Sequence, residues 1–91
     1  MTDVNEVLGE RGSRYGLFID RAEITQTFKR LTRDYLEERN KLLDDDQQES
    51  LDMIFHKIGR IINGDPDYAD SWIDIAGYAQ LVADRLEGKV R

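Results

Sequence analysis

The spacing of apolar residues is the feature that most constrains the fold of this chain. No stretch alternates apolar and polar residues for long enough to predict a β-strand, and a single proline, Pro66, interrupts the sequence. Apolar side chains instead recur every three or four residues, which is the spacing of one face of an α-helix. The sequence therefore predicts an all-α protein.

The first half of the chain is predicted to hold one short and one long helix. Residues 1–10 fit a short helix that Thr2 or Asp3 caps and that ends near Gly9 and Gly12. The second helix is expected from about residue 19 to about residue 43. Its apolar stripe has spacings of four, three and four residues and consists of Ile24, Phe28, Leu31 and Tyr35.

Two further helices are expected on either side of a turn at Pro66. An acidic cluster at residues 44–49 favours the N-terminus of the third helix, which should end at Asn63 and Gly64. The fourth helix is expected to have Asp65 as its N-cap and to run to about Glu87. The apolar stripe of the third helix consists of Leu51, Ile54, Phe55, Ile58, Ile61 and Ile62.

The last helix has two unlike faces. A wide apolar face, predicted to be core, comprises Trp72, Ile75, Ala76, Ala79, Val82, Ala83 and Leu86. The opposite side carries Asp70, Asp74, Gly77, Tyr78 and Leu81. A helix with two such faces usually lies between two layers, so we expect burial along both sides, with the second layer supplied by another subunit.

The length of the chain indicates one domain that gains from self-association. Ninety-one residues leave no room for a second domain, so residues 1–91 are expected to form a single helical domain. A chain this short buries only about 60–65% of its unfolded surface. We therefore predict a small bundle of three main helices plus a short N-terminal helix, completed by dimerisation into a homo-oligomer.

Composition excludes several classes of function. The 19 acidic residues outnumber the 13 lysines and arginines, and the resulting net charge of −6 argues against direct DNA or RNA binding. The absence of cysteine, with one histidine, excludes disulfides, thiol catalysis and structural zinc. The chain has no apolar run long enough for a membrane span and no signal-peptide pattern at its start, so a cytoplasmic protein is expected.

Two aspartates of the last helix are the strongest candidates for a site. Asp70 and Asp74 lie four residues apart, where like charges repel unless a cation offsets them. If they meet Glu49 and Asp52 of the preceding helix, the four carboxylates make an oxygen-rich cluster suited to Mg²⁺. The alternative is purely structural: Asp70 stabilises the first turns, and Asp74 pairs with a nearby lysine or arginine.

Three segments carry a family resemblance. They are 10–18 (Glu-Arg-Gly-Ser-Arg-Tyr-Gly-Leu-Phe), 56–64 (His-Lys-Ile-Gly-Arg-Ile-Ile-Asn-Gly) and 70–79 (Asp-Ser-Trp-Ile-Asp-Ile-Ala-Gly-Tyr-Ala). Together they resemble an uncharacterised family of small proteins from tailed phages and prophages. The chain is also distantly similar to the MazG-like all-α nucleoside triphosphate pyrophosphohydrolases, in which acidic residues on two adjacent helices hold Mg²⁺ against the phosphates of a nucleotide.

The resemblance implies roles for the candidate residues. Asp70 and Asp74 would be the catalytic acidic pair, and Glu49 and Asp52 would complete the Mg²⁺ site. Substrate contacts would come from Lys57 and Arg60, which would face the phosphates. Tyr78 or, as the alternative, Trp72 would pack against the base. The sequence departs from the MazG pattern, which has a Glu-x-x-Asp arm, because the two aspartates here are one residue further apart.

Three functions remain open at this point. The resemblance implies a nucleotide pyrophosphohydrolase, in which Mg²⁺ assists the attack of water on a phosphate. The alternative is a non-catalytic phage protein that binds and inhibits a host protein, such as a defence, CRISPR or polymerase complex, through an acidic surface. A third possibility is capture of a nucleotide without hydrolysis, which would keep the pocket and lose the metal.

Overall fold

Residues 3–91 are described in a computed structural model of the chain. They form four helices and no strand: α1 (Val4–Tyr15), α2 (Phe18–Glu38), α3 (Asp45–Asn63) and α4 (Ala69–Leu86). The predicted all-α class, with three main helices and a short N-terminal one, is confirmed. None of the helices in this part of the chain is long and apolar enough to cross a membrane.

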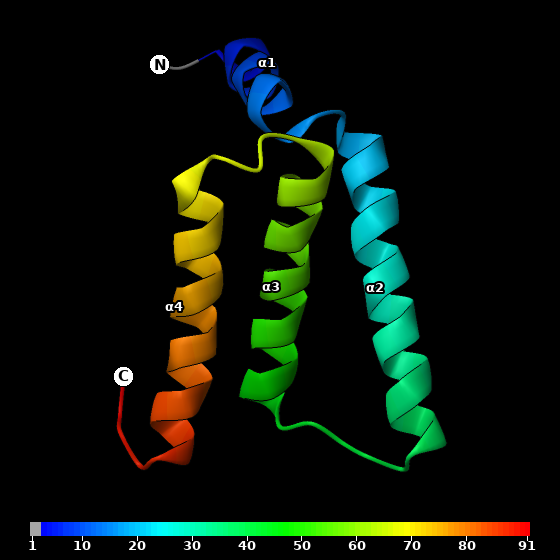
Figure 1. Cartoon of the computed structure of the whole chain (residues 1–91), viewed down its shortest axis with the longest axis vertical. Coiled ribbons are helices and arrows are strands. Elements are labelled where there is room, and N and C mark those ends of the chain that lie inside the picture. Colours follow the sequence, from blue (N-terminus) through cyan, green and yellow to red (C-terminus); the bar gives the residue numbers. More distant parts are fainter. Residues whose placement is uncertain (1–2) are drawn as a thin grey trace.

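The three long helices lie side by side in a single layer. α3 occupies the middle and packs against α2 on one side and α4 on the other, whereas α2 and α4 do not contact each other (Figure 1). α1 lies across the end of the layer where α2 begins and α3 ends. The chain measures 42 × 31 × 26 Å, and α2 and α4 each contact α3 as their one long neighbour among the described residues.

α2 and α3 approach each other closely at a glycine of α3. A Cβ built on Gly59 would stand 2.6 Å from Oγ1 of the buried Thr25, so only glycine fits there. One turn earlier in α3, the rings of Phe55 and Phe28 stack with their centroids 5.8 Å apart. The two helices diverge towards the segment that joins them (Figure 1).

The prediction that the wide apolar face of α4 forms the core is wrong for the single chain. The side of α4 that meets α3 includes Ser71 and Tyr78, and no hydrophobic side chain among residues 3–91 is fully buried. Trp72 and Leu86 are 54% and 59% exposed, and Ala76 is exposed as well. The reason is geometric: in a single layer, an edge helix has only one neighbour.

Two helix ends in the first half of the chain differ from their predicted positions. α1 continues to Tyr15, since Gly9 and Gly12 sit inside the helix with open space around them. Asp3 is its N-cap and accepts a hydrogen bond from the backbone N–H of Asn5, while Thr2 lies outside the described residues. α2 ends at Glu38, several residues earlier than predicted, and Asn40 adopts a positive φ of 50°.

The start of α4 also differs from its predicted position. Asp65 and Pro66 precede the helix instead of opening it, because the Asp65 carboxylate accepts a hydrogen bond from the N–H of Asp67 and closes a turn. Tyr68 then stands at the N-cap. Upstream of this turn, the predicted end of α3 at Asn63 is confirmed.

The C-terminal residues fold back along α4 and enclose one carboxylate. Asp84 is 0% exposed, and its side chain contacts Gln80 Nε2 at 2.7 Å and Arg91 Nε at 2.6 Å. Gly88 has a φ of 81°, which lets the chain reverse directly after the helix. Among residues 3–91, the most buried side chain is therefore that of Asp84, which forms an ion pair with Arg91 at the edge of the layer.

Candidate functional site

A cleft opens where α2 and α3 diverge. It has a volume of about 880 Å³ and lies between the second half of α2, the joining segment and the first half of α3. Three cations line it, namely Lys29, Arg33 and Lys41. Three carboxylates and three leucines complete most of its wall, namely Glu37, Asp45, Asp52, Leu36, Leu42 and Leu43. Its size suits a molecule as large as a nucleotide.

The line of contact between α2 and α3, which we call the seam, continues from this cleft to His56. Lys29 lines the cleft and is also one of four cations whose charges act on His56. Burial, followed by the charges of Arg60, Arg21, Lys57 and Lys29, lowers the pKa of His56 to about 4. The imidazole is therefore neutral at pH 7 and lies among four cations, although the whole chain is acidic.

Two of these cations are held by aromatic rings at the end of the seam. The guanidinium of Arg60 lies 4.4 Å from the centroid of the Tyr15 ring, and that of Arg21 lies 5.7 Å from the same ring. The Nε atom of Arg60 is buried without a hydrogen-bond partner among the described residues. Burial lowers the pKa of Arg21, and the charge of Arg60 lowers it further.

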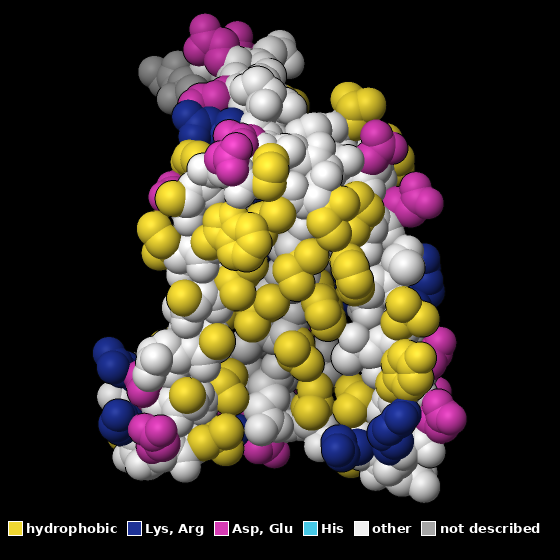
Figure 2. All heavy atoms as spheres, in the orientation of Figure 1, with side chains coloured by type: hydrophobic (Ala, Val, Ile, Leu, Met, Phe, Trp, Pro, Cys, Tyr) yellow, Lys and Arg dark blue, Asp and Glu magenta, His cyan; other side chains and the backbone are white. Residues whose placement is uncertain are grey.

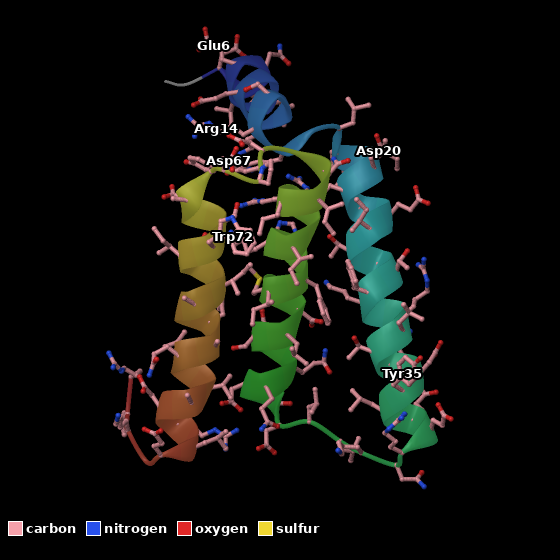
Figure 3. The ribbon with its side chains drawn as sticks, in the orientation of Figure 1. Glu6, Arg14, Asp20, Tyr35, Asp67 and Trp72 are labelled. Carbon is pink, nitrogen blue, oxygen red and sulfur yellow. The ribbon has the colours of Figure 1, made fainter. Side chains whose placement is uncertain are left out.

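The same end of the layer carries a third arginine that lies over an aromatic ring. Arg14 of α1 lies with its guanidinium 4.4 Å from the centroid of the Tyr68 ring, and its carbonyl accepts a hydrogen bond from the N–H of Asp65. Figure 3 shows Arg14 beside Asp67 where α1 meets the turn before α4. α1 is thereby attached to the layer on the side where Arg60 is held.

The four carboxylates predicted to bind Mg²⁺ make separate contacts. Asp74 Oδ2 lies 3.1 Å from Lys57 Nζ, Asp70 accepts a hydrogen bond from the hydroxyl of Tyr68, and Asp52 accepts one from Gln48. Glu49 is exposed. Within residues 3–91, no three acidic or histidine side chains come close enough together to hold a metal ion. One chain alone therefore does not fit the predicted Mg²⁺ site.

The expectation that Asp70 and Asp74 are buried on both sides of α4 is wrong for the single chain. Asp70 is exposed, and the side chain of Asp74 is 46% exposed. The structural alternative describes Asp74 correctly, since Lys57 is its ionic partner. Asp70 lies in the first turn of α4, where a negative charge is favourable.

The three predicted substrate contacts lie in different surroundings. Lys57 is occupied by Asp74, and Arg60 is stacked on Tyr15. Tyr78 borders a shallow hollow of about 440 Å³ together with Asp74, Gly77 and Leu81. Of these residues, Lys57 and Arg60 belong to the positive surroundings of His56.

Sequence reasoning missed the cations of the cleft. The sequence alone assigned no role to Lys29 or Arg33. Their spacing of four residues places both on one side of α2, and this was the signal that could have identified them. The acidic partners Glu37 and Asp45 were missed as well, because their proximity depends on how α2 and α3 diverge.

The chain is a small all-α protein whose three long helices form one layer, with a charged cleft between α2 and α3. It belongs to the family described as "Domain of unknown function (DUF6378)", whose profile matches residues 2–86. No curated protein and no solved structure matches the chain.

Proposed function

We propose that this protein binds the phosphate groups of a nucleotide in the cleft between α2 and α3. The observation that carries the proposal is the row of cations on this seam: Lys29 and Arg33 line a nucleotide-sized cleft, and Arg60 stands further along beside His56. Phosphates are bound by such charge-assisted hydrogen bonds from lysine and arginine. The leucines of the wall offer an apolar surface for a base.

More specifically, we propose that the protein captures a nucleotide without a carboxylate site of its own for the metal ion. The carboxylates of the single chain do not converge, so Mg²⁺ would arrive as part of the Mg²⁺–nucleotide ligand. Asp52, Glu37 and Asp45 line the same cleft and would face that ligand. We propose that the scaffold is MazG-like, that the gene belongs to a phage or prophage, and that the protein acts as a homo-oligomer in the host cytoplasm.

Calorimetric titration with nucleoside triphosphates, with and without Mg²⁺, tests the proposal. Lys29→Ala and Arg33→Ala are each expected to weaken binding about tenfold, the equivalent of one charge-assisted hydrogen bond. Arg30→Ala is the matched control, because this exposed residue of the same helix does not line the cleft. Absence of binding at millimolar nucleotide, or an equal loss in the control, would contradict the proposal.

An assay of pyrophosphate release on the same mixtures separates binding from turnover. Release of pyrophosphate in the presence of Mg²⁺, lost in Asp70→Ala and Asp74→Ala, would indicate the hydrolase that the MazG resemblance implies. Binding without release of pyrophosphate supports capture. The two results differ in one product, so a single assay of wild type and variants decides between them.

One observation favours a second function, the binding of a host protein. Asp45 and Glu49, in the first half of α3, are exposed, as expected of the surface of a docking protein. Arg85 already neutralises part of this surface through Asp44 and Asp46. Charge reversal at Glu49, which is exposed and does not line the cleft, would weaken or abolish a stoichiometric host complex if this function is correct.

A further inference from the structure

One face of the helical layer is apolar and uncovered. Figure 2 shows hydrophobic side chains gathered over α2, α3 and α4 on a single face. Helical spacing places the stripe of each helix on this side. Large members that remain about half exposed are Leu31 and Tyr35 of α2, Ile62 of α3, and Trp72 and Leu86 of α4. We call this surface the apolar face.

The chain exposes more surface than a compact monomer of its mass. The chain exposes 6808 Å², whereas a compact monomer of its mass of 10.6 kDa exposes about 5,500 Å². Its radius of gyration is 15.3 Å, against about 12 Å for a compact domain of its length. The excess of about 1,300 Å² exceeds the roughly 800 Å² that each partner buries in a standard protein interface.

The lack of a core also indicates what covers this face. No hydrophobic side chain of residues 3–91 is fully buried, although 40% of the sequence is hydrophobic. A permanent partner that buries these side chains would stabilise the folded chain. A second copy of the same chain is the partner that is present whenever the protein is made.

We infer that the apolar face is the interface of a homodimer, in which two three-helix layers stack face to face. Because α3 lies in the middle of the layer, a twofold axis perpendicular to the face places the two α3 helices at its centre. Small residues on α4, Ala76 and Ala79, permit close approach of a helix from the second copy.

This interface leaves the cleft accessible. Lys29 and Arg33 lie on the side of α2 turned away from its apolar stripe, so the proposed nucleotide site and the dimer interface occupy opposite faces of the layer. The inference goes beyond the proposed function and does not rest on it. A dimer that binds no nucleotide contradicts the nucleotide site alone, whereas a nucleotide-binding monomer contradicts the interface and the proposed homo-oligomer but leaves the nucleotide site standing.

Sedimentation of the full chain tests the inference. Wild type is expected to sediment at twice 10.6 kDa, and its melting temperature should rise with protein concentration. Ala79→Glu places a charge within the apolar face and is expected to raise the dimer dissociation constant about a hundredfold or more. Ile73→Glu is the matched control: Ile73 is 63% exposed and lies on the side of α4 that points away from α3.

The outcomes separate cleanly even if a variant unfolds. Ala79 is exposed in the single chain, so glutamate there is harmless to a stable monomer. Dissociation or unfolding of Ala79→Glu, together with a folded dimer of Ile73→Glu, supports the interface. Leu31→Glu tests the same face on α2 and should behave like Ala79→Glu. A monomeric wild type, or an Ala79→Glu dimer of unchanged affinity, overturns the inference.

Discussion

Lys57 Nζ lies 3.1 Å from Asp74 Oδ2, and this ion pair joins the middle of α3 to α4. The side chain of Lys57 is only 10% exposed, whereas that of Asp74 is 46% exposed. Loss of the aspartate would therefore leave an almost buried ammonium group without its anion, which costs more than loss of an exposed charge.

Asp74→Ala is expected to lower the free energy of unfolding by about 1–3 kcal/mol in urea denaturation. Asp70→Ala, which removes an exposed carboxylate from the same helix, should change it by less than about 0.5 kcal/mol. Replacement of the whole pair by apolar residues, as in Lys57→Met with Asp74→Leu, should be close to neutral. Equal effects of the two single variants would contradict the assignment of Lys57 as the partner of Asp74.

Gly59→Ala is expected to destabilise the protein by about 1–3 kcal/mol, because its Cβ would stand 2.6 Å from Thr25 Oγ1 and 3.3 Å from Arg21 Cγ. Gly77→Ala is the matched control: nothing lies within 4 Å of a Cβ there, so alanine should stabilise α4 by up to about 1 kcal/mol. Thermal melts give both values.

The double variant Thr25→Ala with Gly59→Ala identifies the clash. Thr25 Oγ1 is buried without a hydrogen-bond partner among the described residues, so its removal sacrifices no hydrogen bond. Stability should return most of the way to that of wild type. Failure of this rescue would show that the backbone of α2, and not the threonine hydroxyl, determines the close approach.

Acidification should weaken the fold through His56. Its pKa is about 4 in the folded chain and 6.5 in an unfolded one, so the unfolded state binds more protons between these values. The contribution of the neutral His56 to the free energy of unfolding is complete above pH 6.5 and is lost as the pH falls towards 4. After allowance for solvent screening, the loss amounts to about 1–2 kcal/mol.

Urea denaturation at a series of pH values between 7 and 4 checks the role of His56. His56→Gln cannot take up a proton, so its stability should vary less with pH over this range. Burial of the imidazole lowers its pKa most, followed by the charges of Arg60, Arg21, Lys57 and Lys29. Parallel pH profiles of wild type and His56→Gln would exclude the effect, and an NMR titration of the imidazole measures the pKa directly.

Asn63 attaches the connection between α1 and α2 to the end of α3. Its side-chain amide donates to the carbonyls of Tyr15 and Leu17, both at 2.9 Å. Asn63→Asp is expected to cost about 1–3 kcal/mol, because a carboxylate would face two acceptors and has no proton to donate. Asn63→Ala should cost less, and a larger effect of alanine than of aspartate would contradict this arrangement.

The sequence by itself determined the class of the fold and the number of its helices. Spacings such as that of Ile24, Phe28, Leu31 and Tyr35 are local, because a helix places residues three and four apart on one side whatever surrounds it. Caps and turns were less predictable: Asp65 was expected to open α4, yet its carboxylate closes a turn with Asp67 instead.

Only the tertiary structure decided what each helix face contacts. The apolar residues around Trp72 were predicted to be core, but α4 is an edge helix of a single layer and leaves them uncovered. The cleft likewise arises from the divergence of α2 and α3, which no local spacing encodes. Periodicity fixes the direction of a side chain around its own helix, whereas its neighbour depends on how separate helices pack.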